Sequence, residues 1–133
     1  MKDYKRRLPN AHSSGVIGKL YEVAEECRVH GWDGEKAAPV TEATFNIANK
    51  FICNLPPGTE SPTVSADPDG AIAFEWYKSP KRVLSISIDA SGFIHYAALL
   101  DSRELHGREP YFGQLPRIIE NIILELGHEK FLK

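Results

Sequence analysis

The sequence predicts an α+β fold with two N-terminal helices, a four-stranded antiparallel meander and one C-terminal helix, the helices lying mainly on one sheet face. Three observations support this prediction. The chain has 133 residues, of which 42% are hydrophobic and 26% charged, and this suits one core. Residues 69–100 contain three strand-like runs separated by short turn signals. Apolar residues recur at helical spacing before and after these runs.

The N-terminal half predicts two helices joined by a loop. The first helix is expected over residues 14–29 and the second over residues 42–54, where Thr41 is a suitable N-cap. Each helix carries an apolar stripe at spacings of three and four, formed by Ile17, Leu20, Tyr21, Ala24 and Cys27 in the first and by Phe45, Ala48, Ile52 and Leu55 in the second. Trp32 lies in the loop, where it either fills the gap between the helices or serves as an exposed binding anchor.

Four strands are expected to follow, at residues 63–66, 71–78, 83–89 and 93–100. Their connections are short and contain glycine, proline or aspartate, so neighbouring strands must run antiparallel. Residues 101–113 mix charge, aromatic groups and glycine, and we expect them to form an irregular crossing. The last helix is predicted to begin near Pro116 and to end at Gly127.

Alternation along the strands separates a bulky face from a small, polar one. The bulky face carries Phe74, Trp76 and Ile86 and is expected to pack under the helices. The opposite face carries Ala73, Glu75, Tyr77, Ser85 and Ser87. In residues 93–100 both alternating sets contain apolar groups, so either His95 or Tyr96 completes the small face. This face is either a solvated surface or a floor on which another molecule docks.

The composition disfavours several classes of protein. A formal net charge of −2 is unlike the cationic excess of a nucleic-acid-binding domain. Residues 1–12 are expected to form a flexible basic arm in front of a single domain over residues 13–133, and only Lys2, Lys5, Arg6 and Arg7 offer a route to nucleic acid. The two cysteines form no C-x-x-C pair, and the chain has neither an apolar leader nor a run of about 18 apolar residues. These features predict a cytoplasmic protein that does not enter a membrane.

No motif for a nucleophile, a phosphate-binding loop or a closely spaced metal site occurs in the sequence, so we assign no catalytic residue, metal or cofactor. Two sets of residues are candidates if the fold brings them together. Glu75, His95, Asp101 and His106 are the acid–base groups that a small hydrolase or ligand-binding enzyme would use. His95, Asp101, His106 and Glu109 are suitable ligands for a divalent transition metal.

Several short motifs occur in a fixed order. They are Gly31-Trp32-Asp33-Gly34, Ala38-Pro39-Val40, Pro68-Asp69-Gly70, Glu75-Trp76, an alternating strand that ends in Asp89, His106-Gly107 and Leu115-Pro116. This ordered set resembles a group of small bacterial proteins that are described as hypothetical, over about residues 14–126. The chain departs from their pattern at Glu35, where the group has an aromatic residue. The resemblance implies one cytoplasmic α+β domain and transfers no activity and no catalytic residue.

We therefore expect a small, soluble, non-enzymatic interaction protein of a regulatory, antitoxin-like or immunity-like kind, with a protein or a second copy of the chain as its partner. The alternative is the hydrolase or ligand-binding enzyme built on the acid–base set. Candidate partner-binding residues are aromatic, imidazole and acidic side chains of the loops and the small sheet face, namely Trp32, Glu75, Tyr77, His95, Tyr96, His106 and Tyr111.

Overall fold

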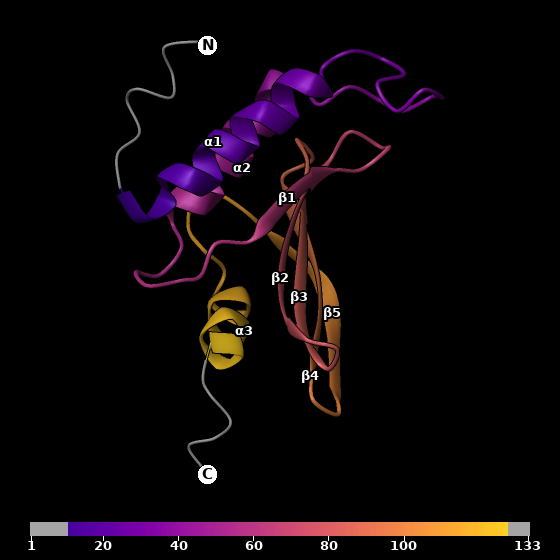
Figure 1. Ribbon diagram of the computed structural model, residues 1–133. Helices are drawn as coiled ribbons and strands as arrows, with labels where there is room; N and C mark the ends of the chain where they lie inside the picture. The colour runs from indigo at the N-terminus through magenta and orange to yellow at the C-terminus, as the bar shows by residue number, and fades with distance from the viewer. Residues whose placement is uncertain (1–10, 128–133) are drawn as a thin grey trace.

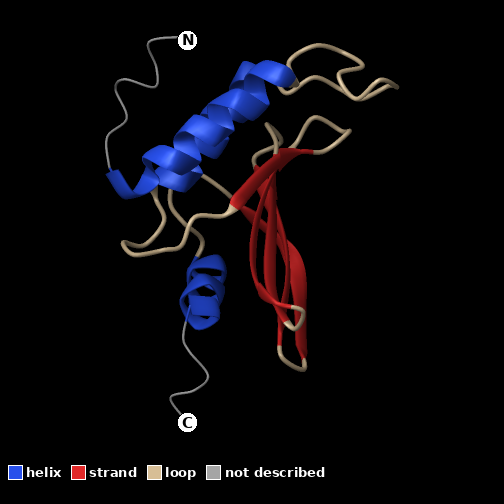
Figure 2. Ribbon diagram, in the orientation of Figure 1, coloured by secondary structure: helices blue, strands red, loops and turns tan. Residues whose placement is uncertain are grey.

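The computed structural model describes residues 11–127, and their side chains from residue 15 onward. In chain order the described elements are α1 (Ala11–Glu26), α2 (Glu42–Cys53), β1 (Thr63–Ala66), β2 (Ile72–Ser79), β3 (Arg82–Ile88), β4 (Phe93–Leu100), β5 (Arg103–Pro110) and α3 (Arg117–Gly127). These helices lie on one side of the sheet and leave its other side uncovered (Figure 1, Figure 2). The predicted α+β class and the antiparallel sheet are confirmed.

The strands form one sheet in the order β1-β2-β3-β4-β5, and every neighbouring pair is antiparallel. The first four strands lie within one residue of their predicted bounds. The predicted number of four strands is wrong, because β5 forms in the stretch that we expected to be irregular. Asp101, at φ 62°, takes the left-handed conformation in the short turn that joins β4 to β5. Sequence patterns conceal β5 because it is an edge strand with exposed charged side chains on both faces and no apolar alternation.

The core lies between the inner face of the sheet and the helices. Phe74, Ile86 and Ile119 are fully buried in it, and Trp76 is 4% exposed. The rings of Phe51 and Phe74 stack with their centroids 5.8 Å apart, which holds α2 against the centre of the sheet. Each large side chain buried in this way contributes about 1.5–3 kcal/mol relative to its exposure. The predicted apolar layer shared by helices and sheet is confirmed.

The register of the sheet determines which side chains of β4 face the core. Tyr96 lies opposite Ile86 and His95 lies opposite Ser87, so the even-numbered residues of β4 face inward and the odd-numbered residues face outward. Tyr96 also lies opposite Gly107, where a Cβ atom would come within 2.9 Å of the tyrosine hydroxyl. The tyrosine ring occupies the space that a side chain on β5 would need, which gives this glycine a packing role.

The loop that carries Trp32 is closed by its own hydrogen bonds. The Trp32 indole N–H donates to the carbonyl of Ala38 over 2.7 Å, and the half-buried ring packs against the core. The carboxylate of Asp33 accepts the backbone N–H groups of Glu35 and Ala37. Trp32 therefore fills the space between the loop and the core.

This loop is joined to the sheet at the turn between β1 and β2. Ala38 donates its backbone N–H to the carbonyl of Pro68 over 2.7 Å. Gly70, at φ 91°, approaches the carbonyl of Pro39 so closely that a Cβ atom would lie 2.8 Å from the oxygen. We call this contact between residues 38–39 and residues 68–70 the loop–turn junction. It fixes the helical layer against one end of the sheet.

The predicted basic arm falls mostly outside the described residues. Residues 1–10, which include Lys2, Lys5, Arg6 and Arg7, are not described. Helix α1 begins at Ala11, so residues 11 and 12, which we assigned to the arm from the sequence, are helical. The helix begins and ends three residues earlier than the predicted range of 14–29.

We predict that Gly70→Ala destabilises the protein much more than Gly92→Ala does. Both glycines have positive φ angles, 91° and 97°, so either substitution costs about 1 kcal/mol or more in backbone strain. Only the new Cβ atom at residue 70 also meets a backbone carbonyl, which adds about 1–3 kcal/mol. Urea unfolding of both variants measures the difference, and equal losses would show that the loop–turn junction adds nothing to the strain.

Candidate functional site

The sheet face turned away from the helices is the candidate functional surface (Figure 1). We call it the outer face, and it consists of alternate side chains of the five strands. These are Thr63, Ser65, Ala73, Glu75, Tyr77, Val83, Ser85, Ser87, Phe93, His95, Ala97, Leu99, Glu104, His106 and Arg108. The charged and aromatic members come from three different strands, so no single stretch of sequence contains them.

The centre of the outer face carries small side chains. Ala73 lies opposite Ser87, and Ser85 lies opposite Ala97. Ser85 and Ala97 are exposed, and no described element lies over them. Side chains this short leave the backbone of the central strands within reach of an approaching surface.

One end of the outer face is apolar. Tyr77 lies opposite Val83, which in turn lies opposite Leu99, so the three side chains form a row across β2, β3 and β4. Tyr77 is 61% exposed, whereas Val83 and Leu99 are half-buried. Glu75 precedes Tyr77 by two residues on β2, and Glu104 lies opposite Leu99 on β5. Carboxylates therefore flank this row, which we call the apolar row.

Strand β5 adds an imidazole and a guanidinium to the outer face. His106 lies opposite Ala97, and Arg108 lies opposite His95. The guanidinium carbon of Arg108 is 4.4 Å from the centroid of the Phe93 ring, which is a cation–π contact. This contact holds the arginine head over the sheet.

Two carboxylates near the opposite end of the outer face have pKa values shifted in opposite directions. Burial raises the pKa of Asp67, and the charge of Asp69 adds to the rise, while a hydrogen bond from the Ser87 hydroxyl (3.4 Å) opposes it. The pKa of Asp89 is lowered, chiefly by a hydrogen bond from the side chain of Ser91. Folding therefore disfavours the charged form of Asp67 and favours the charged form of Asp89.

The candidate partner-binding residues divide between the outer face and the interior. Those on the outer face are Glu75, Tyr77, His95 and His106. Tyr111 is only 8% exposed, its hydroxyl accepts a hydrogen bond from the Asn54 amide (2.8 Å), and its ring meets Phe51 edge-on. Tyr96 lies on the inner face, and Trp32 is closed into its loop. These three aromatic residues lie away from the outer face.

The residues considered for an enzyme are only partly brought together, because His95 and His106 are diagonal neighbours on β4 and β5 while the other acid–base residues lie apart from them. Glu75 on β2 and His106 on β5 are three strand spacings apart, about 14 Å. Asp101 lies in the β4–β5 turn, six residues along the chain from His95, and its carboxylate pairs with Arg82 (3.0 Å). Within residues 11–127 there is no group of three His, Cys, Asp or Glu side chains that could hold a metal ion. In the described part of the chain, therefore, neither the acid–base set nor the metal set converges as a whole on one site.

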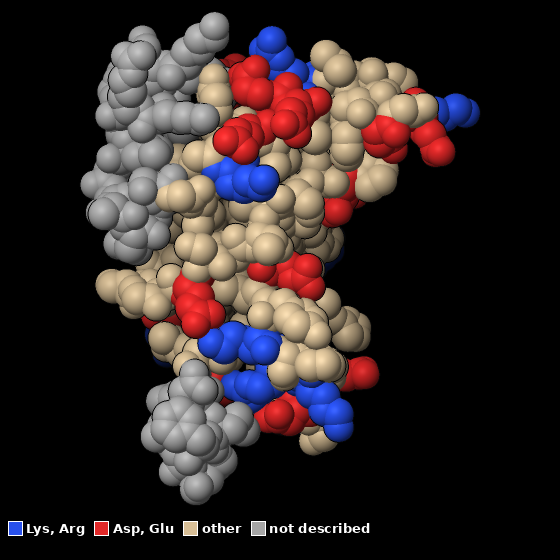
Figure 3. Space-filling model, in the orientation of Figure 1, with Lys and Arg blue, Asp and Glu red and all other residues tan. Residues whose placement is uncertain are grey.

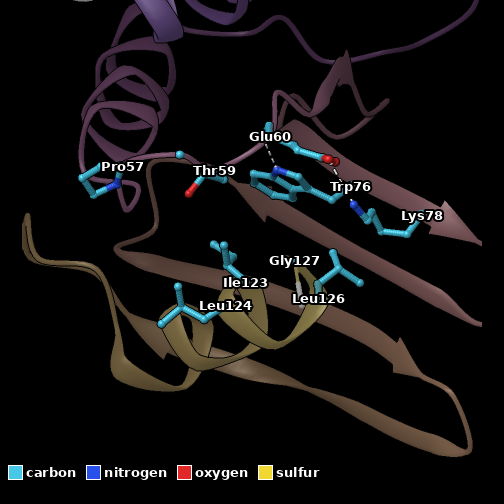
Figure 4. A pocket seen from close by; sticks show the side chains of 10 residues that line it. Pro57, Thr59, Glu60, Trp76, Lys78, Ile123, Leu124, Leu126 and Gly127 are labelled. Atoms are coloured by element: carbon cyan, nitrogen blue, oxygen red, sulfur yellow. Dashed lines mark hydrogen bonds and ion pairs between the residues drawn. The ribbon is translucent and has the colours of Figure 1, made fainter. Parts of the chain in front are cut away.

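A hollow of about 430 Å³ lies between α3, β2 and the segment before β1 (Figure 4). No sequence pattern points to it, because its walls come from three separate segments. The indole N–H of Trp76 donates to the Glu60 carbonyl (2.7 Å), and the ammonium of Lys78 pairs with the Glu60 carboxylate (3.0 Å). Leu124 adds an exposed apolar side chain. The hollow therefore offers apolar surface while its main polar groups are already paired, and we assign it no function.

A buried arginine fixes the C-terminal helix on the sheet. Arg82 is 7% exposed and donates to the Asp101 carboxylate and to the carbonyl of Glu125 (2.8 Å) near the end of α3. Arg103 binds the Glu125 carboxylate at the surface through two contacts, of 2.9 and 3.1 Å. Cations suit this end of a helix because its last carbonyls are free and its dipole is negative there.

Comparison of the chain with protein-family models, curated proteins and solved structures finds no match. Acidic and basic side chains of the described residues are interspersed on the face shown in Figure 3. None of the helices in the described part of the chain combines the length and the apolar character that a membrane crossing requires.

We predict that Arg82→Met lowers the free energy of unfolding by about 2 kcal/mol, because helix carbonyls lose a buried donor. The matched change Arg103→Met should cost less than about 1 kcal/mol, because its ion pair is largely exposed. Chemical denaturation of the two variants tests this order. A larger loss for Arg103→Met would contradict the anchoring role of Arg82.

The pKa shifts of Asp67 and Asp89, at the end of the outer face away from the apolar row, predict that Asp67→Asn and Asp89→Asn change stability in opposite directions. A raised folded-state pKa means that Asp67 contributes stability at low pH that is lost as the pH rises through that pKa, so Asp67→Asn should stabilise the protein at about pH 7. Asp89 has a lowered pKa and contributes stability that is lost as the pH falls through it, so Asp89→Asn should destabilise the protein at about pH 7. Both differences should shrink towards about pH 3, and thermal melts at the two pH values measure them. If both variants moved the melting temperature at about pH 7 in the same direction, the opposite pKa shifts of Asp67 and Asp89 would be contradicted.

Proposed function

We propose that this chain is a non-enzymatic binding protein that docks a protein partner on the outer face of its sheet. The observation that carries the proposal is a five-stranded antiparallel sheet whose outer face has small side chains at its centre and no described element packed on it. Stoichiometric binding through such a face requires no catalytic group, and it is consistent with a regulatory, antitoxin-like or immunity-like role.

The composition of the outer face favours contact with protein over solvation alone. A sheet face that meets only water carries polar side chains. Here exposed Glu75 and His106 stand at the two ends of a row whose middle is the short Ser85 and Ala97. Tyr77 exposes most of its side chain. Tyrosine is enriched at the energetic centres of interfaces, because it combines a large apolar ring with a hydroxyl.

The apolar row determines the chemistry of the partner. Tyr77, Val83 and Leu99 offer contact to an aliphatic or aromatic side chain. Glu75 and Glu104 add negative charge beside that contact. Opposite charges across an interface speed association and select the partner. The partner segment therefore carries a leucine-, isoleucine- or phenylalanine-like group next to lysine or arginine.

Site-specific crosslinking tests the location of the docking surface. A photo-crosslinking amino acid at Ser85 in the full chain, expressed in its native cells, should trap the partner. The same amino acid at Asn46, an exposed position on α2, is the control and should not trap it. No adduct specific to Ser85, or equal adducts at both positions, would count against the outer face.

We predict that Ser85→Arg weakens binding of the trapped and then purified partner at least about tenfold, because a long cation at the centre of the face blocks close approach. Asn46→Arg should leave the affinity unchanged. Both positions are exposed, so each variant should keep its melting temperature within about 2 °C. Calorimetric titration measures the affinities, and unchanged binding by Ser85→Arg would overturn the proposal.

A further inference from the structure

Among residues 11–127, strand β5 has one free edge. It is the last strand of the described sheet and pairs only with β4, while α3 packs on β3 and β4 and touches β5 through the Arg103–Glu125 ion pair. Tyr111 donates its backbone N–H to the carbonyl of Gly92, on the side of β4. Because backbone groups alternate in direction along a strand, the odd-numbered residues of β5 bond to β4, and Glu104, His106 and Arg108 turn their backbone N–H and C=O groups away from the sheet.

The charges along this edge are arranged symmetrically with opposite signs. Arg103 lies three residues before His106, and Glu109 lies three residues after it. Glu104 lies two residues before His106, and Arg108 lies two residues after it. An antiparallel pair of two such strands, centred on His106, therefore places every charged residue opposite a charge of the other sign.

We propose that two copies of the chain pair through β5, antiparallel and about a twofold axis at His106. Glu104 then lies opposite Arg108 of the second copy, and Arg103, whose guanidinium is already bound to Glu125 of its own chain, lies opposite Glu109 of the second copy. Symmetry repeats both pairs. The outward-facing residues form three pairs with two backbone hydrogen bonds each, about six in total. Two sheets of five strands become one sheet of ten.

The charge pattern selects this register among its neighbours. A centre at Leu105 would place Glu104 opposite His106 but would leave both arginines of the strand without a carboxylate partner. A centre at Gly107 would place His106 opposite Arg108. The register at His106 also places Leu105 opposite Gly107, so the inward-facing side chains do not collide.

Charged residues on an edge strand commonly serve to prevent pairing, and a strand protected in this way would need charges of one sign. A run of one sign repels every antiparallel copy of itself, whereas the order of charges in β5 is complementary to its own antiparallel copy. Pro110 lacks an N–H group and ends the ladder at that end of the strand. One strand pair is a small interface, so we expect a dimer that dissociates at micromolar to millimolar concentration.

The twofold axis runs perpendicular to the sheet, so both outer faces lie on the same side of the dimer. The docking surface of one copy then continues into that of the other. The inference stands independently of the proposed function, because it rests on the edge of β5 and not on the centre of the face.

Charge exchange in the full chain tests the pairing. Sedimentation velocity is run from about 1 µM to about 1 mM on the native chain, on Glu104→Arg, on Arg108→Glu and on the double variant. Each single variant puts like charges opposite each other twice and should weaken dimerisation about tenfold or more. The double variant restores opposite charges and should return within about threefold of the native chain. Loss of the Arg108–Phe93 contact is common to Arg108→Glu and the double variant, so it cannot explain a rescue.

Hydrogen exchange gives a second measurement that does not depend on substitution. The amides of Glu104, His106 and Arg108 should exchange more slowly as protein concentration rises, while the odd-numbered amides of β5 should be protected throughout. Ser85→Arg, at the centre of the outer face, is the control and should leave the dimer intact. A chain that is monomeric at every concentration, a double variant that fails to recover, or a dimer broken by Ser85→Arg would overturn the proposal. Loss of partner binding with an intact dimer would instead concern the docking surface alone.

Discussion

The burial of one sheet face beneath the helices is the interaction on which the other features of the molecule depend. Alternation along each strand commits its side chains to one inner and one outer set. Because Phe74 and Ile86 are held in the core, Glu75 and Ser85 must face outward. A slip of one residue in a strand would move the polar set into the core, so the register and the core composition fix each other. The outer face is therefore as well determined as the core.

The short motifs of the sequence serve this same architecture. Trp32 and Asp33 close a loop with their own hydrogen bonds, and that loop meets the turn at Gly70. The close approach at this junction requires the absence of a Cβ atom, which is a structural demand and not a chemical one. Motifs that stand out in a sequence can thus describe how layers are joined, while the proposed docking surface has ordinary serine and alanine residues at its centre.

The parts of the fold that follow from local pattern could be predicted from the sequence, and the parts set by long-range contacts could not. Strands β1 to β4 have apolar alternation or clear turns, whereas β5 owes its conformation to pairing with β4. The inward set of β4 follows from the register of Tyr96 with Ile86 and not from hydrophobicity. Tyr111 lies among charged and glycine residues in sequence, yet its hydroxyl accepts a hydrogen bond from Asn54, 57 positions away, and its ring packs on Phe51.

The two proposed contacts use different chemistry and can therefore coexist. The outer face presents side chains, so its specificity comes from the apolar row and from the carboxylates beside it. The free edge of β5 presents backbone groups that any strand could bond, so its specificity must come from the order of charges around His106. Glu104 belongs to both, as a neighbour of Leu99 on the face and as a charge on the edge. Pairing at the edge neutralises that carboxylate and leaves Glu75 as the main anionic group beside the apolar row, so dimerisation would change the charge that a docking partner meets.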